Sequence, residues 1–324
     1  MIRTITRLAA ATLGAFALVA AASASAQQKY PDRTITMIIP FGAGGSTDIV
    51  GRIAAEAMAK NLGVSIVVDN RAGAGGTIGA QAAANAQPDG YTVTMSTTST
   101  HVVGPLTLPS AKYSPVKDFE HVGMIAETPY VLVVSPKLAV KNVQELIDFA
   151  KKNPGKLNYG SAGEGSTTHL AGLMFLNATG TKMEHIPYKS NAESTKAVMT
   201  DEVQVLFGSM PAVLAQIKAG SIKALAVGSA ARSPELPDAP TIAEAGVPGY
   251  RATLWLGLSA PAKTPPAVIT RLSQALDAAI SNPDIAKRLS AAGAEASKMS
   301  SGDFTKLISR ELEVYGKIVA GMKK

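Results

Sequence analysis

A glycine-rich turn at residues 41–48 follows an apolar run at residues 34–40 and precedes a helix-like pattern of apolar side chains at residues 49–57. This order of strand, glycine turn and helix directs the unpaired N–H groups of the first helical turn at a single place. The helix macrodipole adds roughly half a positive charge there, so the turn is suited to bind an anion. An ordinary tight turn, with Ser46 or Asp48 capping the helix, is the alternative interpretation.

The anion that suits this turn is a carboxylate rather than a phosphate. The phosphate-loop motif G-x-x-x-x-G-K-[ST] is absent, and Gly42-x-Gly44 is followed by Thr47 where the dinucleotide fingerprint needs a third glycine. The turn also contains no lysine that could meet a β- or γ-phosphate. Ser46 and Thr47 instead add hydroxyl groups, which can donate hydrogen bonds to a carboxylate.

The N-terminus has the pattern of a secretory signal peptide. Residues 1–7 are basic, residues 8–22 are apolar, and residues 24–26 read Ala-Ser-Ala, a small-x-small cleavage site. The apolar run is short and rich in alanine, which favours a removed signal over a membrane-spanning helix. We therefore predict a signal peptide at residues 1–26 and an exported, periplasmic protein. The absence of cysteine from the chain is compatible with that compartment.

Composition argues against a nucleic-acid partner. The formal net charge is +7, but the basic residues are scattered along the chain and aromatic residues make up only 5% of it. No basic run is interleaved with aromatic residues, as nucleic-acid surfaces require. A mild positive field that favours small anions is the implication that remains.

Strand-like and helix-like segments alternate through the first third of the chain. Strands are predicted at residues 64–68 and 91–95, with a second glycine turn at residues 70–79 and a hydroxyl cluster at residues 96–101. Such alternation predicts a parallel α/β sheet, in which ligands bind beyond the carboxyl ends of the strands. Thr98, Ser99 and His101 are therefore candidate ligand contacts. Local turn hydrogen bonding is the alternative role of Thr98 and Ser99, and capping of a helix terminus is the alternative role of His101.

The opening pattern returns in the middle of the chain. After a predicted strand at 130–134 and a helix from residue 142, residues 157–159 lead into a glycine and hydroxyl turn at residues 160–169 and then a helix. Two helix N-termini of the same chemistry, facing each other across a cleft, would clamp one carboxylate between two sets of N–H donors. This second turn contributes the candidate contacts Ser161, Gly165, Ser166 and Thr167.

The rest of the chain continues the α/β pattern. The length suggests two domains. The remaining predicted elements are a helix from about residue 192, strands at 203–207, 222–227 and 255–258, and helices at 211–219, 265–280, 283–291 and 302–322.

Motifs spread over essentially the whole mature chain carry a family resemblance. They are Ile39-Pro40-Phe41 with residues 44–48, Asn70-Arg71 with residues 73–76, residues 88–91, residues 116–119, residues 159–161 with Gly165-Ser166 and His169-Leu170, residues 186–189, residues 217–220, residues 225–227, residues 232–234 and Gly249-Tyr250. With these motifs the chain resembles the substrate-binding receptors of tripartite tricarboxylate transporters, also called Bug-type receptors.

This resemblance implies a two-domain periplasmic binding protein fold of the α/β class, type II-like, with two crossover strands and the ligand cleft between the domains. We expect residues 27–128 and 252–324 in one domain and residues 129–251 in the other. The family's two N-terminal turns hold one ligand carboxylate, and its partners are two integral membrane subunits. We expect a monomer without a cofactor or metal.

The chain departs from the family pattern at several positions, including Ala72, residues 190–193, Gly208 and Leu254. Gly208 stands where an aspartate or asparagine is common, which predicts room for a bulkier or aromatic acid. Asp48 is expected to shape the turn or to pair with Arg52, because its negative charge would repel a carboxylate. The expected ligand contacts are Phe41, Gly44, Gly45, Ser46, Thr47, Thr98, Ser99, His101, Ser161, Gly165, Ser166, Thr167, Asn191 and Gly208.

We predict a receptor and not an enzyme. The chain has neither G-x-S-x-G nor H-E-x-x-H, and a secreted hydrolase is the disfavoured alternative. A receptor that signals through a membrane partner would use the same fold and site, so that alternative stays open. The ligand also stays open among di- and tricarboxylates, acidic amino acids, aromatic carboxylates and nicotinate-like acids.

Overall fold

The structure, a computed structural model, describes residues 30–322. The chain divides into two units, Met1–Asp32 and Arg33–Lys324, and every helix and strand given below belongs to the second. The predicted signal peptide at residues 1–26 lies outside the described residues. Within residues 30–322, no helix has the length and apolar character needed to cross a membrane.

The N-terminal part of the second unit is a strand-and-helix alternation. The strands are parallel, as predicted, and their order is β2-β1-β3. Buried apolar side chains of β1 explain why this segment forms an interior strand. The elements are β1 (Ile35–Ile39), α2 (Ser46–Leu62), β2 (Ile66–Asn70), η1 (Ala74–Gly76), α3 (Thr77–Ala84), β3 (Thr92–Thr97), η2 (Ser99–Val103) and α4 (Gly104–Thr107).

One long strand, β4 (Phe119–Val134), runs through the middle of the sheet. As far as Pro129 it pairs antiparallel with β9 (Thr253–Pro261), and from Tyr130 onward it pairs antiparallel with β7 (Val205–Ser209). The sequence predicted only the last five residues of this strand. We call the side of the sheet with β1–β3, β9 and β10 (Glu295–Met299) the first lobe. The second lobe is the side with β5 (Asn158–Ser161), β6 (Glu184–Pro187), β7 and β8 (Lys223–Val227).

The second lobe repeats the alternation with the parallel order β6-β5-β7. Its apolar core is formed by Val131, Val198, Leu206 and Val213 with their neighbours. The elements are α5 (Val143–Lys152), β5 (Asn158–Ser161), α6 (Thr167–Thr179), β6 (Glu184–Pro187), α7 (Asn191–Thr200), α8 (Met210–Lys218) and β8 (Lys223–Val227).

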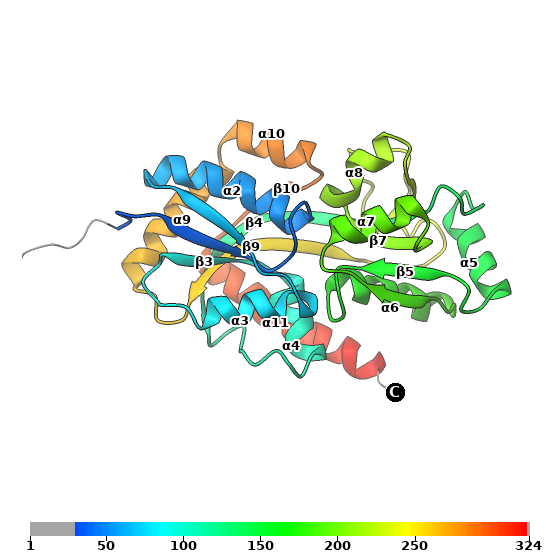
Figure 1. The fold of residues 1–324 in the computed structure, drawn as a ribbon, viewed down its shortest axis with the longest axis horizontal. Helices are drawn as coiled ribbons and strands as arrows, with labels where there is room; N and C mark the ends of the chain where they lie inside the picture. The colour runs from blue at the N-terminus through cyan, green and yellow to red at the C-terminus, as the bar shows by residue number, and fades with distance from the viewer. Residues whose placement is uncertain (1–29, 323–324) are drawn as a thin grey trace, which may run out of the picture. The chain divides into compact units, whose positions relative to one another are not determined.

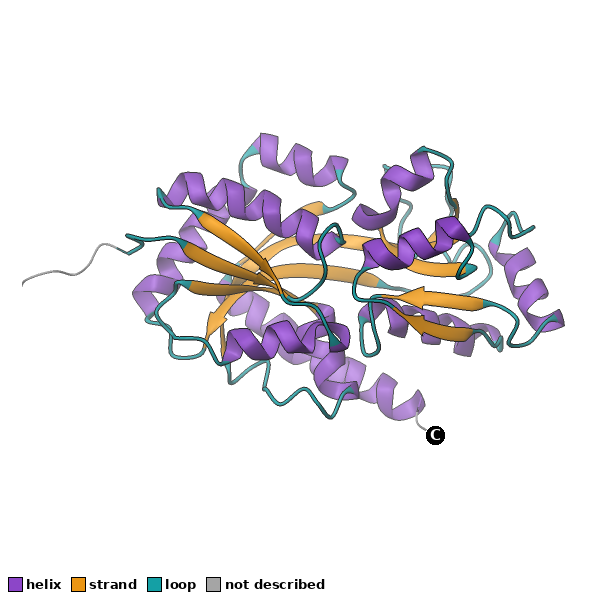
Figure 2. Cartoon of the chain, viewed as in Figure 1, coloured by secondary structure: helices purple, strands orange, loops and turns teal. Residues whose placement is uncertain are grey.

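The C-terminal segment returns to the first lobe through β9, which lies between β3 and β4. It continues as α9 (Pro266–Ile280), α10 (Pro283–Ala291), β10 (Glu295–Met299) and α11 (Ser301–Met322), with Phe304 and Ile308 of α11 packed near Trp255. Helices α2 and α10 lie on one face of the first lobe's strands and α3, α4 and α11 on the other (Figures 1 and 2).

The sheet as a whole is mixed, because the parallel arrangement predicted from the first third of the chain holds for β1, β2 and β3 whereas β4 and β9 are antiparallel to their neighbours. The order is β2-β1-β3-β9-β4-β7-β5-β6, with β8 and β10 also paired to β4. Strands β4 and β9 run antiparallel to their neighbours because they carry the chain from one lobe to the other and back. Residues on the two sides of the β4 midpoint can thus meet across the space between the lobes.

Candidate functional site

Three helices begin at one place in the fold. Helix α2 follows β1, α6 follows β5 and α7 follows β6, so each starts after the carboxyl end of a parallel strand. Ser166 caps α6 by accepting a hydrogen bond from the backbone of His169, and Ser190 caps α7 in the same way. Gly45 precedes α2 without a side-chain cap, which leaves that terminus open.

The first residues of the three helices line one narrow cavity between the lobes. None of its lining residues is Asp, Glu, Lys, Arg or His. A positive potential in the cavity therefore comes from backbone N–H groups and helix dipoles rather than from cationic side chains. The lining residues are Phe41, Gly45, Ser46, Thr47, Ser99, Tyr130, Ala162, Ser166, Thr167, Thr168, Asn191 and Leu254.

Several donors at this cavity have no partner within the described residues. The N–H groups of Ser46, Thr47, Thr168 and Asn191 make no hydrogen bond there, and neither do the hydroxyl groups of Ser46 and Thr47. These residues are buried, so the donors face the cavity rather than bulk water. A hydrogen bond to a charged acceptor contributes about 1.5–3 kcal/mol, so hydrogen bonds from these donors would stabilise a bound anion.

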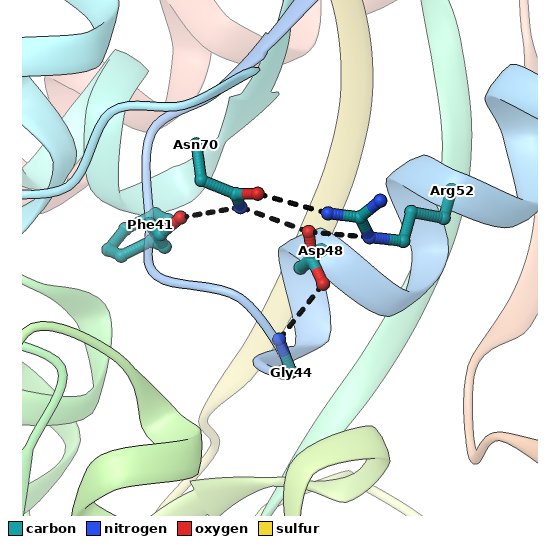
Figure 3. A network of polar contacts seen from close by, with 5 residues as sticks. All are labelled: Phe41, Gly44, Asp48, Arg52 and Asn70. Carbon is teal, nitrogen blue, oxygen red and sulfur yellow. Dashed lines mark hydrogen bonds and ion pairs between the residues drawn. The ribbon is translucent and has the colours of Figure 1, made fainter. Parts of the chain in front are cut away.

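A polar network holds the first turn in shape (Figure 3). The Asn70 side chain, at the end of β2, donates from Nδ2 to the Phe41 carbonyl and to Asp48 Oδ1, both at 2.9 Å. Arg52 donates to Asp48 Oδ1 at 3.0 Å and to Asn70 Oδ1 at 3.1 Å. Gly44 N donates to Asp48 Oδ2 at 2.9 Å. Both predicted roles of Asp48 are confirmed, because it shapes the turn and pairs with Arg52.

The negative charge of the Asp48 carboxylate is balanced by partners that do not line the cavity. Burial alone would raise its pKa, but hydrogen bonds from Arg52, Gly44 and Asn70 outweigh burial and hold the pKa below its ordinary value of 3.8. The carboxylate is thus ionised at neutral pH with its oxygens committed to these donors. Its charge stabilises the turn and leaves the helix N-terminus free to attract an anion.

Replacing Asn70 by alanine is expected to loosen the turn. The Asn70→Ala variant loses the hydrogen bonds to Phe41 and Asp48 and should lower the free energy of unfolding by about 1–3 kcal/mol. Ligand affinity should fall by about tenfold, because the turn is no longer held in its binding shape. Urea unfolding and calorimetric titration measure the two effects. Asn61→Ala, at an exposed asparagine bonded to Arg271, is the control, and equal effects of the two variants would contradict the role of the network.

Direct contacts join the two lobes beside the cavity. The Ser99 hydroxyl accepts from Thr167 N at 2.9 Å and lies 2.8 Å from Thr167 Oγ1, while Tyr130 OH is hydrogen-bonded to the same Oγ1. Gly42 N donates to Lys189 O at 3.4 Å. The structure is therefore closed: the Ser99 hydroxyl of the first lobe accepts from the first N–H group of helix α6 in the second lobe.

The structure brings together eight of the residues predicted from sequence. They come from the two predicted turns, the end of β3 and the start of α7. The eight are Phe41, Gly45, Ser46, Thr47, Ser99, Ser166, Thr167 and Asn191.

Three predicted contacts from the two turns do not line this cavity. The N–H of Gly44 is bonded to Asp48, so it is not free for a ligand. The Ser161 hydroxyl is buried and bonded to His185 Nε2 at 2.6 Å. Gly165 packs against Leu108 and lines a different hollow. Each of the three residues contacts other parts of the protein instead of the cavity.

Thr98 and His101 are also absent from the cavity lining, because the chain turns inward after β3. The Thr98 hydroxyl accepts from Trp255 N, and His101 is fully buried with its ring 4.6 Å from that of Phe119. Burial lowers the pKa of His101 well below its usual range, with a smaller contribution from His121, so the ring stays neutral in the core of the first lobe.

The prediction that Gly208 leaves room for a bulky ligand is wrong. Gly208 lies in β7, does not line the cavity, and has Val213 Cγ1 only 2.4 Å from where a Cβ would stand. The space beside this glycine is filled by α8. Glycine is required here for close packing of strand and helix rather than for ligand size.

The sequence prediction missed four residues of the cavity. Tyr130 was predicted only as part of a strand and Leu254 was noted only as a departure from the family pattern. Thr168 and Ala162 lie within the second turn, and their proximity to Thr167 and Ser161 was the available signal. Tyr130 and Leu254 gave no local signal, because strands β4 and β9 bring them to the cavity from distant parts of the chain.

Comparison with known proteins gives a consistent result. The model of the family "Tripartite tricarboxylate transporter family receptor" matches residues 50–323. The chain is 38% identical to protein BugT of Bordetella pertussis over 266 residues, 82% of each chain. It is similar to the structure of R. palustris Rpa4515 with adipate (34% identity, TM-score 0.88, 91% of this chain and 99% of that one). It is also similar to MatC from Rhodopseudomonas palustris with bound malate (30% identity, TM-score 0.86, 90% and 100%).

Proposed function

The chain belongs to the tripartite tricarboxylate transporter receptor family, and from that premise we propose that it binds a small carboxylate between its lobes and delivers it to the membrane subunits of such a transporter. The family consists of solute-binding receptors rather than enzymes, and its α/β fold is that of periplasmic binding proteins. Relatives with adipate and with malate bound support a carboxylate as the ligand.

The convergence of three helix N-termini on one cavity carries this proposal. The sequence predicted two of these termini, and α7 adds the third. Their free N–H groups suit a carboxylate, and the lining has no lysine or arginine to balance the larger charge of a phosphate.

We propose that ligand binding and lobe closure are one equilibrium. A carboxylate that accepts from Ser46 and Thr47 in the first lobe and from Thr168 in the second stabilises the closed state, because only that state offers both sets of donors. The Ser99–Thr167 contacts lie beside the ligand and favour the same state. The closed receptor then docks on the membrane subunits, and no covalent step is required.

The lobes of this mechanism correspond to the predicted domains, residues 27–128 with 252–324 and residues 129–251. The change of partner along β4, from β9 at Pro129 to β7 at Tyr130, supports a boundary at this point. Export through the signal peptide at residues 1–26 would place the mature receptor in the periplasm, where the family's binding proteins act.

A thermal-shift screen of the mature protein, beginning at Gln27, tests the proposed ligand class. A carboxylate at 100 times its Kd should stabilise the protein by about 2.7 kcal/mol and raise Tm by about 5 °C. Neutral sugars and inorganic phosphate are the controls and should leave Tm unchanged. Stabilisation by a sugar but by no carboxylate would overturn the proposal.

A further inference from the structure

Asn191 Oδ1 is a fully buried amide acceptor of a cavity-lining residue, and it accepts no hydrogen bond from any described residue. The residue is 7% exposed and opens helix α7. Its Nδ2 donates to Ser209 Oγ at 3.0 Å, whereas its Oδ1 accepts no hydrogen bond. An amide carbonyl left unpaired in a buried site costs about 1–3 kcal/mol, so a ligand that supplies a donor here recovers that free energy.

A carboxylate alone cannot supply this donor. An ionised carboxyl group only accepts hydrogen bonds, and one of its oxygens placed against Oδ1 would be repelled. The other free groups of the cavity are the N–H and hydroxyl groups of Ser46 and Thr47 and the N–H groups of Thr168 and Asn191. The cavity thus combines donors for an anionic group with the Asn191 amide oxygen, which can only accept and so requires a different group on the same ligand.

The lining favours a hydroxyl over an ammonium group as that donor. A buried ammonium needs a carboxylate partner, because an unpaired buried charge costs several kcal/mol. The lining contains no Asp or Glu, and the nearby Asp48 carboxylate is committed to Arg52, Asn70 and Gly44. A neutral hydroxyl satisfies Oδ1 without bringing a second charge into the cavity.

We propose that the ligand is a short-chain hydroxycarboxylate, whose hydroxyl donates to Asn191 Oδ1 while its carboxylate accepts from the helix N-termini. This inference rests on the proposed carboxylate-binding function and narrows its substrate class. The three helix N-termini and Asn191 surround one narrow cavity, so the carboxylate and the hydroxyl group must lie close together on the ligand. Asn191 is the specificity-determining residue in this arrangement.

Calorimetric titration of the mature protein with matched acids tests the proposal. The two pairs are L- or D-malate against succinate and L- or D-lactate against propionate, which differ only by the hydroxyl, and L-aspartate carries an ammonium in its place. The better-bound hydroxy acid should bind about 10- to 100-fold more tightly than its deoxy partner, the effect of one satisfied buried acceptor. It should also bind more tightly than aspartate.

Two variants assign the discrimination to Asn191. In Asn191→Ala the hydroxy and deoxy acids should bind within about threefold of each other. Ser209→Ala removes the partner of Nδ2 but keeps Oδ1, so the preference should persist. Equal or tighter binding of the deoxy acids to the unmodified protein would overturn the proposal even if Asn191→Ala failed to fold. Tighter binding of aspartate would overturn the choice of a hydroxyl, whereas binding of no carboxylate would instead refute the proposed function.

Discussion

Lowering the pH from 7 to 5 is expected to reduce the free energy of unfolding by at least about 4 kcal/mol. All four histidines of the chain are paired inside the two lobes, and each has a lowered pKa. Burial lowers the pKa of His121 to about 4, and burial followed by the neighbouring His185 lowers that of His169 to about 4. With an ordinary value of 6.5 in the unfolded chain, each of these two contributes about 2 kcal/mol between pH 7 and pH 5.

The sign follows from which state binds the protons. Below pH 6.5 the unfolded chain takes up protons on its histidines, while the folded protein keeps His121 and His169 neutral down to about pH 4. The stabilisation is therefore fully present above pH 6.5 and is lost as the pH falls towards 4. Carboxylates with lowered pKa, such as Asp48, also stabilise the folded protein, but this stabilisation is lost mainly at still lower pH. The window from pH 7 to pH 5 thus reports chiefly on the histidines.

Urea unfolding at pH 7, 6 and 5 measures this loss. Fluorescence of Trp255, the single tryptophan, reports on the first lobe, and circular dichroism reports on the whole chain. The His169→Gln variant removes one titrating group. The decrease in its free energy of unfolding between pH 7 and pH 5 should therefore be about 2 kcal/mol smaller than that of the unmodified protein, whatever its stability at pH 7. A stability that stays constant from pH 7 to pH 5 would show that these rings are not held neutral by burial.

Replacing Gly45 by leucine is expected to lower ligand affinity by at least about 100-fold, or about 2.7 kcal/mol. A Cβ at Gly45 would lie 3.7 Å from Asn191 N and 3.8 Å from Ser190 Cβ, both in the second lobe. The longer leucine side chain would either hold the lobes apart or fill the cavity, and in both cases the ligand loses donors of one lobe. Calorimetric titration with the best acid from the thermal-shift screen measures the effect.

Two matched glycine variants separate this effect from general damage. Gly45→Ala adds only ordinary van der Waals contacts at 3.5–3.8 Å and should change affinity by less than about threefold. Gly302→Leu adds the same bulk on α11, where no atom lies within 4 Å of the new Cβ, and should bind as the unmodified protein does. Undiminished affinity in Gly45→Leu would refute the model of a ligand held between the two lobes.

Much of the fold followed from local patterns in the sequence. The strand at β1, the helices α2, α9 and α10, and the helix start at Asn142 agree with the prediction because apolar periodicity and caps are local signals. The first eleven residues of β4 and the whole of β10 were missed. These strands carry no alternating pattern strong enough to be seen without their partners, and pairing with β9 and with each other defines them.

The candidate site was predicted in part for the same reason. Ser46 and Thr167 begin helices that follow glycine turns, and such a start can be predicted from the neighbouring residues alone. His101 and Gly208 were wrongly predicted to contact the ligand, because their surroundings depend on tertiary packing. The His101 ring packs in the core against Phe119, and Val213 fills the space beside Gly208. A sequence pattern locates a turn but does not reveal which of its atoms face a cavity.

The sequence by itself determined that this chain has helix N-termini suited to an anion and that it resembles a family of carboxylate receptors. Only the tertiary structure decided that the starts of α2, α6 and α7 share one cavity, with Tyr130 and Leu254 beside them. It also decided that Asn191 Oδ1 has no partner within residues 30–322. The physical reason is that hydrogen bonding at a helix terminus is local. Convergence of three termini instead depends on β4 and β9, which join the lobes and pair residues more than a hundred positions apart.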